Sequence, residues 1–169
     1  MAQPQLRAPV AARRILLATI LCLLAQVAAA EEILGRVVGI TDGDTLTLLT
    51  EQHAEVRIRL AEIDTPERGQ PYGTQARRSL SDLAFGKVVR VVVRDTDRYG
   101  RTVGRVYAGQ LDVNADMVRR GAAWVYRRYS DDPALLRIEH EAQAEHRRLW
   151  GLPEAERMPP WEWRRVGHR

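Results

Sequence analysis

The stretch "ILGRVVGITDGDTLTLLTEQHAEVRIRLAEI", residues 33–63, contains three short runs in which apolar and polar residues alternate. A period of two is typical of half-buried strands. The Asp-Gly pair in "TDGDT" indicates a tight turn between the first two runs, and residues 52–54 turn the second run into the third. We therefore predict an antiparallel meander of three strands. In the third run the apolar residues share one face and the arginines share the other: Val56, Ile58 and Leu60; Arg57 and Arg59.

The rest of the chain adds two strands and several helices. Alternation predicts a fourth and a fifth strand at residues 87–95 and 102–108, and a short extended segment within 122–126. Apolar spacing and end signals predict helices over 72–85, within 112–121, and from Asp131 or Asp132 through Leu149. Five strands, one inserted helix and two following helices predict a mainly β, α+β fold, a five-stranded OB-fold barrel with about three packed helices. A parallel α/β sheet would need a helix after nearly every strand.

The first thirty residues have the pattern of a secretory signal peptide. Arg7, Arg13 and Arg14 precede an apolar run, residues 15–27, and Ala28-Ala29-Ala30 offers a cleavage site. The run is shorter than the ~20 residues of a membrane-spanning helix. We expect cleavage after this site and export to the periplasm or the outside of the cell, with no membrane attachment afterwards. The predicted organisation is a signal peptide at 1–30, one domain at 31–152 and a Pro/Trp-rich tail at 153–169.

Removal of the signal peptide changes the charge and the cysteine count. The whole chain has 26 basic and 22 acidic residues, but without its three N-terminal arginines the balance is 23 to 22. A basic surface on the mature domain must therefore come from arrangement and not from excess. Cys22 is the chain's one cysteine, so the mature protein has no disulfide and no thiol chemistry. The four histidines lack metal-ligand spacing, which disfavours zinc.

Three polar clusters interrupt the predicted strands: "DGDT" at residues 42–45, "RLAEIDTPE" at 59–67 and "DRYGR" at 97–101. Each one alone is typical of a turn, a helix entry or a surface loop. The second cluster crowds Asp64 and Glu67 around one turn, which costs stability unless a cation or an arginine lies between the carboxylates.

Together these clusters supply a set of groups that suits phosphate chemistry. Asp44 and Asp64 are hard oxygen donors at the ends of strands expected to be neighbours, which suits Ca²⁺ or Mg²⁺. Arg59 and Arg101 can each hold phosphate oxygens through two N–H groups, a geometry that lysine lacks. Glu67 has no arginine partner in its own turn and can orient or deprotonate water. In-line attack on a phosphodiester needs such a set, because negative charge develops on the phosphate oxygens.

The motifs "DGDT", "R-x4-DTPE" and "YGR", in this order, resemble those of the staphylococcal nuclease (thermonuclease) family. The similarity runs from about Gly35 to the region of Trp150, nearly the whole mature domain. The resemblance implies an OB barrel with three helices, in agreement with the elements predicted above. It also implies a secreted Ca²⁺-dependent endonuclease that cuts both DNA and RNA and typically leaves 3′-phosphate products.

The resemblance carries over to individual residues. It implies that Asp44, Asp64 and the main-chain carbonyl of Thr65 hold Ca²⁺. It further implies that two arginines bind the scissile phosphate and that one glutamate is the general base: Arg59 and Arg101; Glu67. The neighbouring polar residues would lie just outside the metal shell or brace the arginine loop: Asp42 and Thr45; Asp97.

The chain also departs from the best-known member of that family. Only "RGQP" separates Glu67 from Tyr72, where that member has a longer, lysine-rich loop, and Lys87 is the one lysine of the mature domain. Arginine must therefore carry most phosphate contacts. Tyr126 and Tyr129 are candidates for stacking on a substrate base. The tryptophans are interpreted as core residues and as anchors of the tail "MPPWEWRR", which is expected to pack back as an extended strap.

Three functions fit these observations to different degrees. The first is the Ca²⁺-dependent endonuclease, acting as a monomer on DNA and RNA. The second is a non-catalytic nucleic-acid-binding module, because OB barrels are common binding scaffolds. The third is a structural or protein-interaction module on an inactive nuclease fold. Neither alternative requires a complete set of carboxylates and arginines, and this chain has the complete set, so the endonuclease is the function that the sequence predicts.

Overall fold

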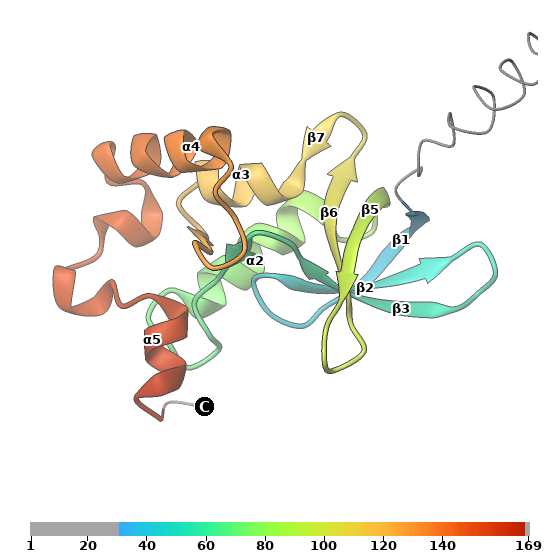
Figure 1. Cartoon of the computed structure of the whole chain (residues 1–169), viewed down its shortest axis with the longest axis horizontal. Coiled ribbons are helices and arrows are strands. Elements are labelled where there is room, and N and C mark those ends of the chain that lie inside the picture. Colours follow the sequence, from blue (N-terminus) through green and yellow to red (C-terminus); the bar gives the residue numbers. More distant parts are fainter. Residues whose placement is uncertain (1–30, 168–169) are drawn as a thin grey trace, which may run out of the picture.

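The predicted barrel is present in the computed structural model, which describes residues 31–167 (Figure 1). Six strands form one sheet in the order β3-β2-β1-β5-β6-β7, and a parallel pairing of β3 with β6 closes five of them into a barrel. The strands are β1 Glu32–Ile40, β2 Thr45–Thr50, β3 Glu55–Leu60, β5 Val88–Thr96, β6 Thr102–Ala108 and β7 Leu111–Asp112. The five-stranded OB-type barrel predicted from the sequence is therefore confirmed.

Bulges and an apolar interior allow so few strands to close. The register shifts between Val37 and Gly39 in β1, and between Val93 and Asp95 in β5. Such bulges bend a strand and increase its twist. The inward-facing side chains fill the barrel, and the following are fully buried: Val37, Leu46, Leu48, Ile58, Val91 and Val106. The predicted division of β3 into an apolar face and an arginine face is part of this pattern.

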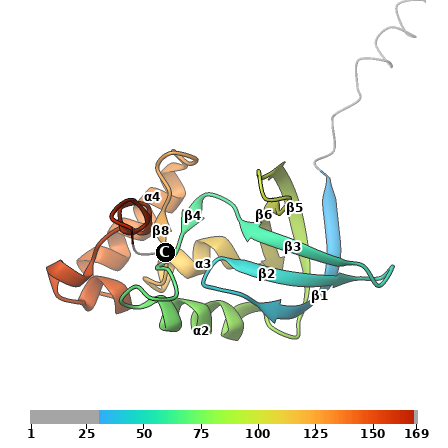
Figure 2. The same ribbon diagram turned by 90° about the horizontal axis from the view of Figure 1, so that it is seen from below.

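The helices cover one end and one side of the barrel (Figure 2). The three longest are α2 Gly73–Ala84, α3 Val113–Arg119 and α4 Pro133–Ala144. Asp112 and Asp132 cap the last two, since each side chain accepts a hydrogen bond from a backbone N–H of the first turn. Asn114 is completely buried, accepts from the N–H of Val106 and donates to the carbonyl of Ala61. These bonds attach α3 beside the β3–β6 closure.

A second, two-stranded sheet lies beside the barrel. It pairs β4 Ile63–Asp64 with β8 Trp124–Val125, and Asp64 lies opposite Trp124. The ladder holds the segment that follows β3 against the segment that follows α3. The position of Asp64 is therefore fixed by backbone hydrogen bonds on a short strand.

The expected helix through Leu149 is wrong, because α4 ends at Ala144. His146 and Arg148 have positive φ angles of 52° and 51°, which an α-helix does not tolerate. The N–H of Leu149 donates instead to the carbonyl of Gly121, and Leu149 is buried. A short 3₁₀ turn, η1 Arg148–Gly151, follows. Packing against the end of α3 therefore overrides the apolar spacing that suggested a longer helix.

The expected extended strap at the C-terminus is also wrong. After a 3₁₀ turn, η2 Glu154–Glu156, the segment forms a short helix, α5 Pro160–Arg165. Its proline stands in the first turn, where a missing N–H costs nothing, its glutamate lies in the same turn, and its arginines lie in the last. Those end signals favour a helix, and the prolines mark its start.

Some predictions fall outside what the structure tests. The predicted signal peptide, residues 1–30, lies outside the described residues. The division at residues 152 and 153 stays a prediction. Within residues 31–167, no helix has the length and apolar character needed to cross a membrane.

Candidate active site

The turn between β1 and β2 brings Asp44 into the interior. Asp44 is 6% exposed, its N–H donates to Oδ1 of Asp42 at 3.1 Å, and its carbonyl accepts from the N–H of Leu60 at 2.8 Å. A Cβ atom on Gly43 would lie 2.6 Å from Oγ1 of Thr65. Glycine at this position therefore allows the turn to approach the segment that carries Asp64.

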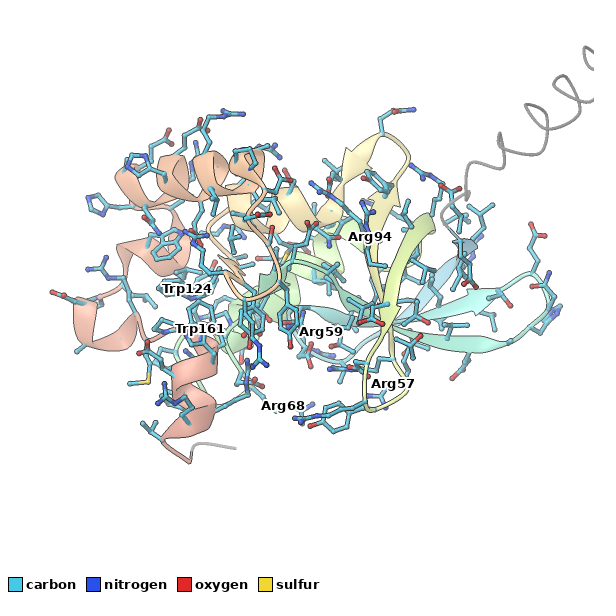
Figure 3. The ribbon with its side chains drawn as sticks, viewed as in Figure 1. Arg57, Arg59, Arg68, Arg94, Trp124 and Trp161 are labelled. Carbon is cyan, nitrogen blue, oxygen red and sulfur yellow. The ribbon has the colours of Figure 1, made fainter. Side chains whose placement is uncertain are left out.

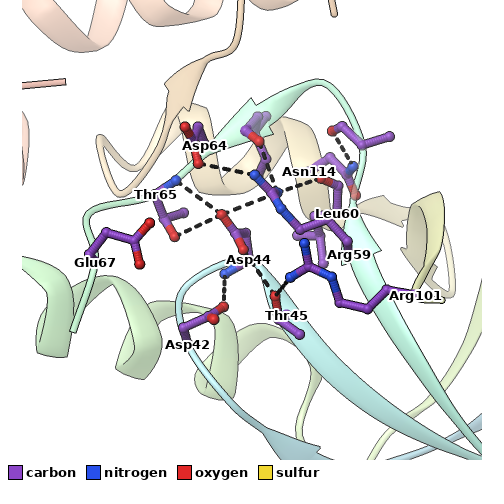
Figure 4. A network of polar contacts seen from close by, with 12 residues as sticks. Asp42, Asp44, Thr45, Arg59, Leu60, Asp64, Thr65, Glu67, Arg101 and Asn114 are labelled. Atoms are coloured by element: carbon purple, nitrogen blue, oxygen red, sulfur yellow. Dashed lines mark hydrogen bonds and ion pairs between the residues drawn. The ribbon is translucent and has the colours of Figure 1, made fainter. Parts of the chain in front are cut away.

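The carboxylate of Asp44 joins the two segments (Figure 4). Its Oδ2 accepts from both the backbone N–H and the hydroxyl of Thr65, each at 3.1 Å. Its Oδ1 accepts from the hydroxyl of Thr45 at 3.1 Å. Thr65 follows Asp64 in the sequence, so its two bonds to Asp44 hold the segment that carries Asp64 against the turn between β1 and β2.

Arg59 lies between the two buried aspartates. Its Nη1 is 3.1 Å from Oδ2 of Asp44, and its Nη2 donates to Oδ1 of Asp64 at 3.0 Å. The same guanidinium donates to the carbonyls of Leu60 and Ile63 at 2.8 and 3.0 Å. Its position at the end of β3 follows from the strand alternation, and its planar fork reaches both carboxylates at once.

Burial makes this group of carboxylates electrostatically costly. Burial raises the pKa of Asp42 to about 6, and the neighbouring Asp44 carboxylate adds to the rise. Burial also raises the pKa of Asp64, which is 1% exposed, although the bond from Arg164 and the charge of Arg59 oppose that rise. The folded protein therefore holds negative charge here against its own desolvation cost.

Glu67 lies in the turn that follows β4, with its side chain 37% exposed. The turn is fixed by a hydrogen bond in which the backbone N–H of Glu67 donates to Oε1 of Gln70 at 3.0 Å. A Cβ atom on Gly73 would lie 1.9 Å from the carbonyl oxygen of Glu67, so this close approach requires glycine. Gln70 in turn donates to the carbonyl of Met158 at 2.5 Å, which joins the turn to the C-terminal segment.

Arg101 reaches the site from the loop between β5 and β6. Asp97 accepts from the backbone N–H of Arg101 at 3.0 Å and from its Nε at 2.7 Å. Burial is the largest single influence on the pKa of Asp97 and raises it, but the bonds from Arg101 and from the N–H of Tyr99 together lower it below its ordinary value. Nη1 of Arg101 donates to the hydroxyl of Thr45 at 3.3 Å. The guanidinium therefore contacts the residue that follows Asp44 in the sequence.

The structure places the two candidate tyrosines in contact with each other, and Tyr126 against α5. Tyr126 stacks on Trp161, with ring planes 4° apart and centroids at 5.3 Å. Tyr129 meets Tyr126 edge to face at 4.9 Å and is 64% exposed. One face of Tyr126 is therefore covered by α5, whereas Tyr129 presents its ring to solvent.

Sequence reasoning missed Arg164 of α5. Its Nη2 lies 2.6 Å from Oδ2 of Asp64, and its Nη1 lies 2.6 Å from Oε1 of Glu67. Burial alone would lower the pKa of this guanidinium, but the bonds to Asp64 and then Glu67 raise it instead. Arg164 is 97 residues from Glu67, and no local pattern pointed to the contact.

The arrangement brings the predicted groups together on one side of the barrel. Two buried carboxylates, a guanidinium between them, a second guanidinium on a braced loop and an exposed carboxylate lie at the ends of neighbouring strands: Asp44 and Asp64; Arg59; Arg101; Glu67. Within the described residues, no three or more His, Cys, Asp or Glu side chains are arranged as a metal site. A cation at the two aspartates would therefore complete its shell with main-chain oxygens, water or substrate.

Comparison with known proteins agrees with this geometry. The family model described as "Staphylococcal nuclease homologue" matches residues 57–151. A protein of Haemophilus influenzae named "Uncharacterized endonuclease" is 41% identical over 155 residues, which cover 90% of this chain and 86% of that protein. A protein of Shigella flexneri named "Micrococcal nuclease" is 43% identical over 155 residues, 85% of this chain and 87% of that protein. The chain belongs to the staphylococcal nuclease homologue family.

The similarity extends to a further bacterial protein. A protein of Escherichia coli, also named "Uncharacterized endonuclease", is 46% identical over 134 residues, which cover 79% of this chain and 86% of that protein. The resemblance inferred from three short motifs is therefore confirmed at the level of the family.

Proposed function

We propose that this chain is a Ca²⁺-dependent endonuclease that hydrolyses phosphodiester bonds of DNA and RNA. The nuclease class follows from the family and from the names of its relatives. The observation that carries the finer proposal is the pair of buried carboxylates, Asp44 and Asp64, with arginines around them and Glu67 at the edge. A binding module would not need to keep such a costly group of charges.

The donor set suits a hard divalent cation. Asp44 and Asp64 offer only oxygen, and burial, which raises the pKa of Asp42 and Asp64, makes a positive partner at these carboxylates favourable. Asp44, Asp64 and the carbonyl of Thr65 would hold Ca²⁺, with Asp42 beside them. When bound, the ion supplies positive charge that polarises a phosphoryl oxygen.

The arginines have the geometry to bind the scissile phosphate. Arg101 is held by Asp97 on a loop at the rim, and Arg59 lies between the two aspartates. Each guanidinium can donate two parallel N–H bonds to phosphate oxygens, and these bonds strengthen as charge develops there. Arg59 would exchange part of its bonds to Asp44 and Asp64 for the phosphate, and Arg101 would exchange its bond to Thr45.

Glu67 is the proposed general base. Its carboxylate is part exposed at the edge of the carboxylate group, where water can reach it. It would accept a proton from a water molecule as the water oxygen bonds to phosphorus; the bond from phosphorus to the 5′ oxygen would break, and the departing 5′ oxygen would take a proton from solvent water. The products would carry a 3′-phosphate and a 5′-hydroxyl.

The test is cleavage of single-stranded DNA, double-stranded DNA and RNA by the purified protein with Ca²⁺, with EDTA and with Mg²⁺. We expect cleavage with Ca²⁺ that EDTA abolishes, and 3′-phosphate ends on the products. Tight binding of nucleic acid without cleavage under any metal would instead support the binding module.

Export and oligomeric state are also proposals. The basic, apolar and small-residue segments of residues 1–30 support cleavage after Ala30 and export to the periplasm or the medium. Mass determination of the protein from each cell fraction would check the cleavage site and the location. We further propose that the mature protein is a monomer, which light scattering after size-exclusion chromatography would test.

A further inference from the structure

Helix α5 lies outside residues 57–151, which match the family model, yet it packs beside the candidate site. Trp161 stacks on Tyr126 and meets the edge of Trp124, with centroids 5.3 and 5.9 Å apart. Trp124 and Trp161 are labelled near each other beside α5 in Figure 3. A six-residue helix is marginal by itself, so these aromatic contacts hold it in place.

From this position α5 directs Arg164 onto the carboxylates. Nη2 of Arg164 lies 2.6 Å from Oδ2 of Asp64, and Nη1 donates to Oδ1 of the same residue at 3.3 Å. Nη1 also lies 2.6 Å from Oε1 of Glu67. One guanidinium therefore bridges the proposed metal ligand, Asp64, and the proposed base, Glu67, and offsets the repulsion between their like charges.

A guanidinium and a divalent cation compete for these oxygens. Oδ1 of Asp64 already accepts from Arg59, so Arg164 and Arg59 together occupy both oxygens of that carboxylate. A divalent cation would be a third positive group at this carboxylate, and like charges so close repel. The side chain of Arg164 is 37% exposed and that of Arg59 is 15% exposed, so the bond from Arg164 is the one that a cation at Asp64 would more readily displace.

A cleft of about 1150 Å³ lies beside α5, and Arg164 is one of the residues that line it. Five arginines line it: Arg98, Arg127, Arg128, Arg164 and Arg165. Three aromatic residues complete the lining, and no Asp or Glu of residues 31–167 is among the lining residues. Arginines interleaved with aromatic rings are the usual lining of a groove for single-stranded nucleic acid. A guanidinium released from Asp64 would meet phosphate in this cleft.

We propose that Arg164 is a phosphate-binding residue of the active site that exchanges the carboxylates of Asp64 and Glu67 for a phosphate of the nucleic-acid strand when the cation binds. The proposal rests on the proposed function. It adds α5 to the active site and makes binding of the cation and of the strand favour each other. The cation takes the carboxylates that hold Arg164, and the strand takes the guanidinium that competes for those carboxylates.

The experiment measures two affinities of the purified protein by isothermal titration calorimetry. The first titrant is CaCl₂ alone. The second, with saturating CaCl₂, is a single-stranded phosphorothioate oligodeoxynucleotide, chosen because its linkages resist hydrolysis. The variants are Arg164→Ala, Arg164→Gln as a second choice that keeps polar bulk, and Arg165→Ala as the matched control. Arg165 carries the same charge, lies in the same helix and lines the same cleft, whereas Arg164 is the residue whose ion pairs to Asp64 and Glu67 are under test.

We expect the two affinities of Arg164→Ala to change in opposite directions. Affinity for Ca²⁺ should rise about tenfold as the competitor is removed, and affinity for the oligonucleotide should fall about tenfold. Arg165→Ala should weaken the oligonucleotide and leave Ca²⁺ affinity near that of the wild type. Unchanged or weaker Ca²⁺ binding in Arg164→Ala would overturn the exchange, and unchanged oligonucleotide binding would overturn the phosphate contact.

These outcomes are separate from failure of the proposed function. Cleavage by the wild-type protein with Ca²⁺ decides the function, whereas the difference between the two arginine variants decides the role of Arg164. Equal increases of Ca²⁺ affinity in Arg164→Ala and Arg165→Ala would show long-range charge and not contact, and would also overturn the proposal.

Discussion

Two groups of acidic residues in this protein are each organised around arginine, and they differ in what folding does to their carboxylates. Away from the site, Arg105 contacts Asp112, Glu62 and Asp132 at 2.7, 3.2 and 3.4 Å. We call these four residues the Arg105 cluster. At the candidate site, Arg59 and Arg164 contact the buried Asp64.

Asp132 of the Arg105 cluster gains from folding. Asp112 and Asp132 also cap α3 and α4, and the N–H of Ala134 and the nearby Arg105 hold the pKa of Asp132 below its ordinary value. Burial has the opposite effect at the site, where it raises the pKa of Asp64. Similar residue types therefore stabilise the fold in one place and cost stability in the other, which is typical of a functional site.

The largest expected effect is that of Glu67→Gln on catalysis. Loss of the base should lower turnover by about 10²–10⁴-fold, while the melting temperature changes little because the side chain is part exposed. Cleavage rates and thermal denaturation would check both. Glu62→Gln in the Arg105 cluster is the control and should cleave normally. Intact turnover in Glu67→Gln would remove this residue from the role of base.

Arg59→Lys should be the next most severe change. Lysine cannot reach Asp44 and Asp64 through two separate nitrogens, so kcat/KM should fall by about 10²–10³-fold. Steady-state cleavage of a defined oligonucleotide would measure the loss. Arg105→Lys, the same replacement in the other cluster, should retain cleavage. Near-normal rates in Arg59→Lys would place Arg59 outside the phosphate site.

Arg105→Ala should act on stability and not on catalysis. Its removal leaves three carboxylates without their shared charge partner, and we expect a loss of about 2 kcal/mol in the free energy of unfolding. Urea denaturation would measure this loss. Cleavage by the folded fraction should be normal. Reduced cleavage by fully folded Arg105→Ala protein would mean that the Arg105 cluster and the candidate site are not separate.

Asp132 gives the smallest expected effect, and it depends on pH. Asp132→Ala removes the cap of α4 and should cost about 1 kcal/mol at neutral pH, whereas Asp132→Asn keeps an acceptor oxygen. The folded pKa lies below the ordinary value of 3.8, so the charge stabilises the fold above that value. The advantage of the wild type over Asp132→Asn should therefore shrink as pH falls below about 4. Denaturation at several pH values would measure this difference. An advantage of the wild type that did not change with pH would contradict this account.

The sequence predicted the parts of the fold that depend on local pattern. The barrel strands were predicted correctly because alternation and turn residues are local signals, and the groups around Asp44 and Asp64 lie at strand ends for the same reason. The end of α4 was not predicted, because His146 and Arg148 adopt positive φ angles to let Leu149 reach Gly121. Such a tertiary contact has no signal in local spacing.

The site was predicted only as far as its motifs reach. Arg164 contacts residues about a hundred positions earlier in the chain, and it lies in a segment interpreted as an extended strap. Asn114 was likewise missed, because a buried side chain that satisfies the barrel closure looks in sequence like an ordinary helical residue. Both depend on how distant elements pack together.

The central claim is that the buried aspartates bind a cation, whereas the Arg105 cluster does not. The most direct measurement is the melting temperature of the purified protein with CaCl₂ and with EDTA, for the wild type, Asp44→Asn and Asp112→Asn. A bound ligand at 100 times its Kd stabilises by about 2.7 kcal/mol, so the melting temperature of the wild type should rise by several degrees. The rise should be lost in Asp44→Asn and kept in Asp112→Asn. No rise in the wild type, or an equal rise in Asp44→Asn, would contradict the account.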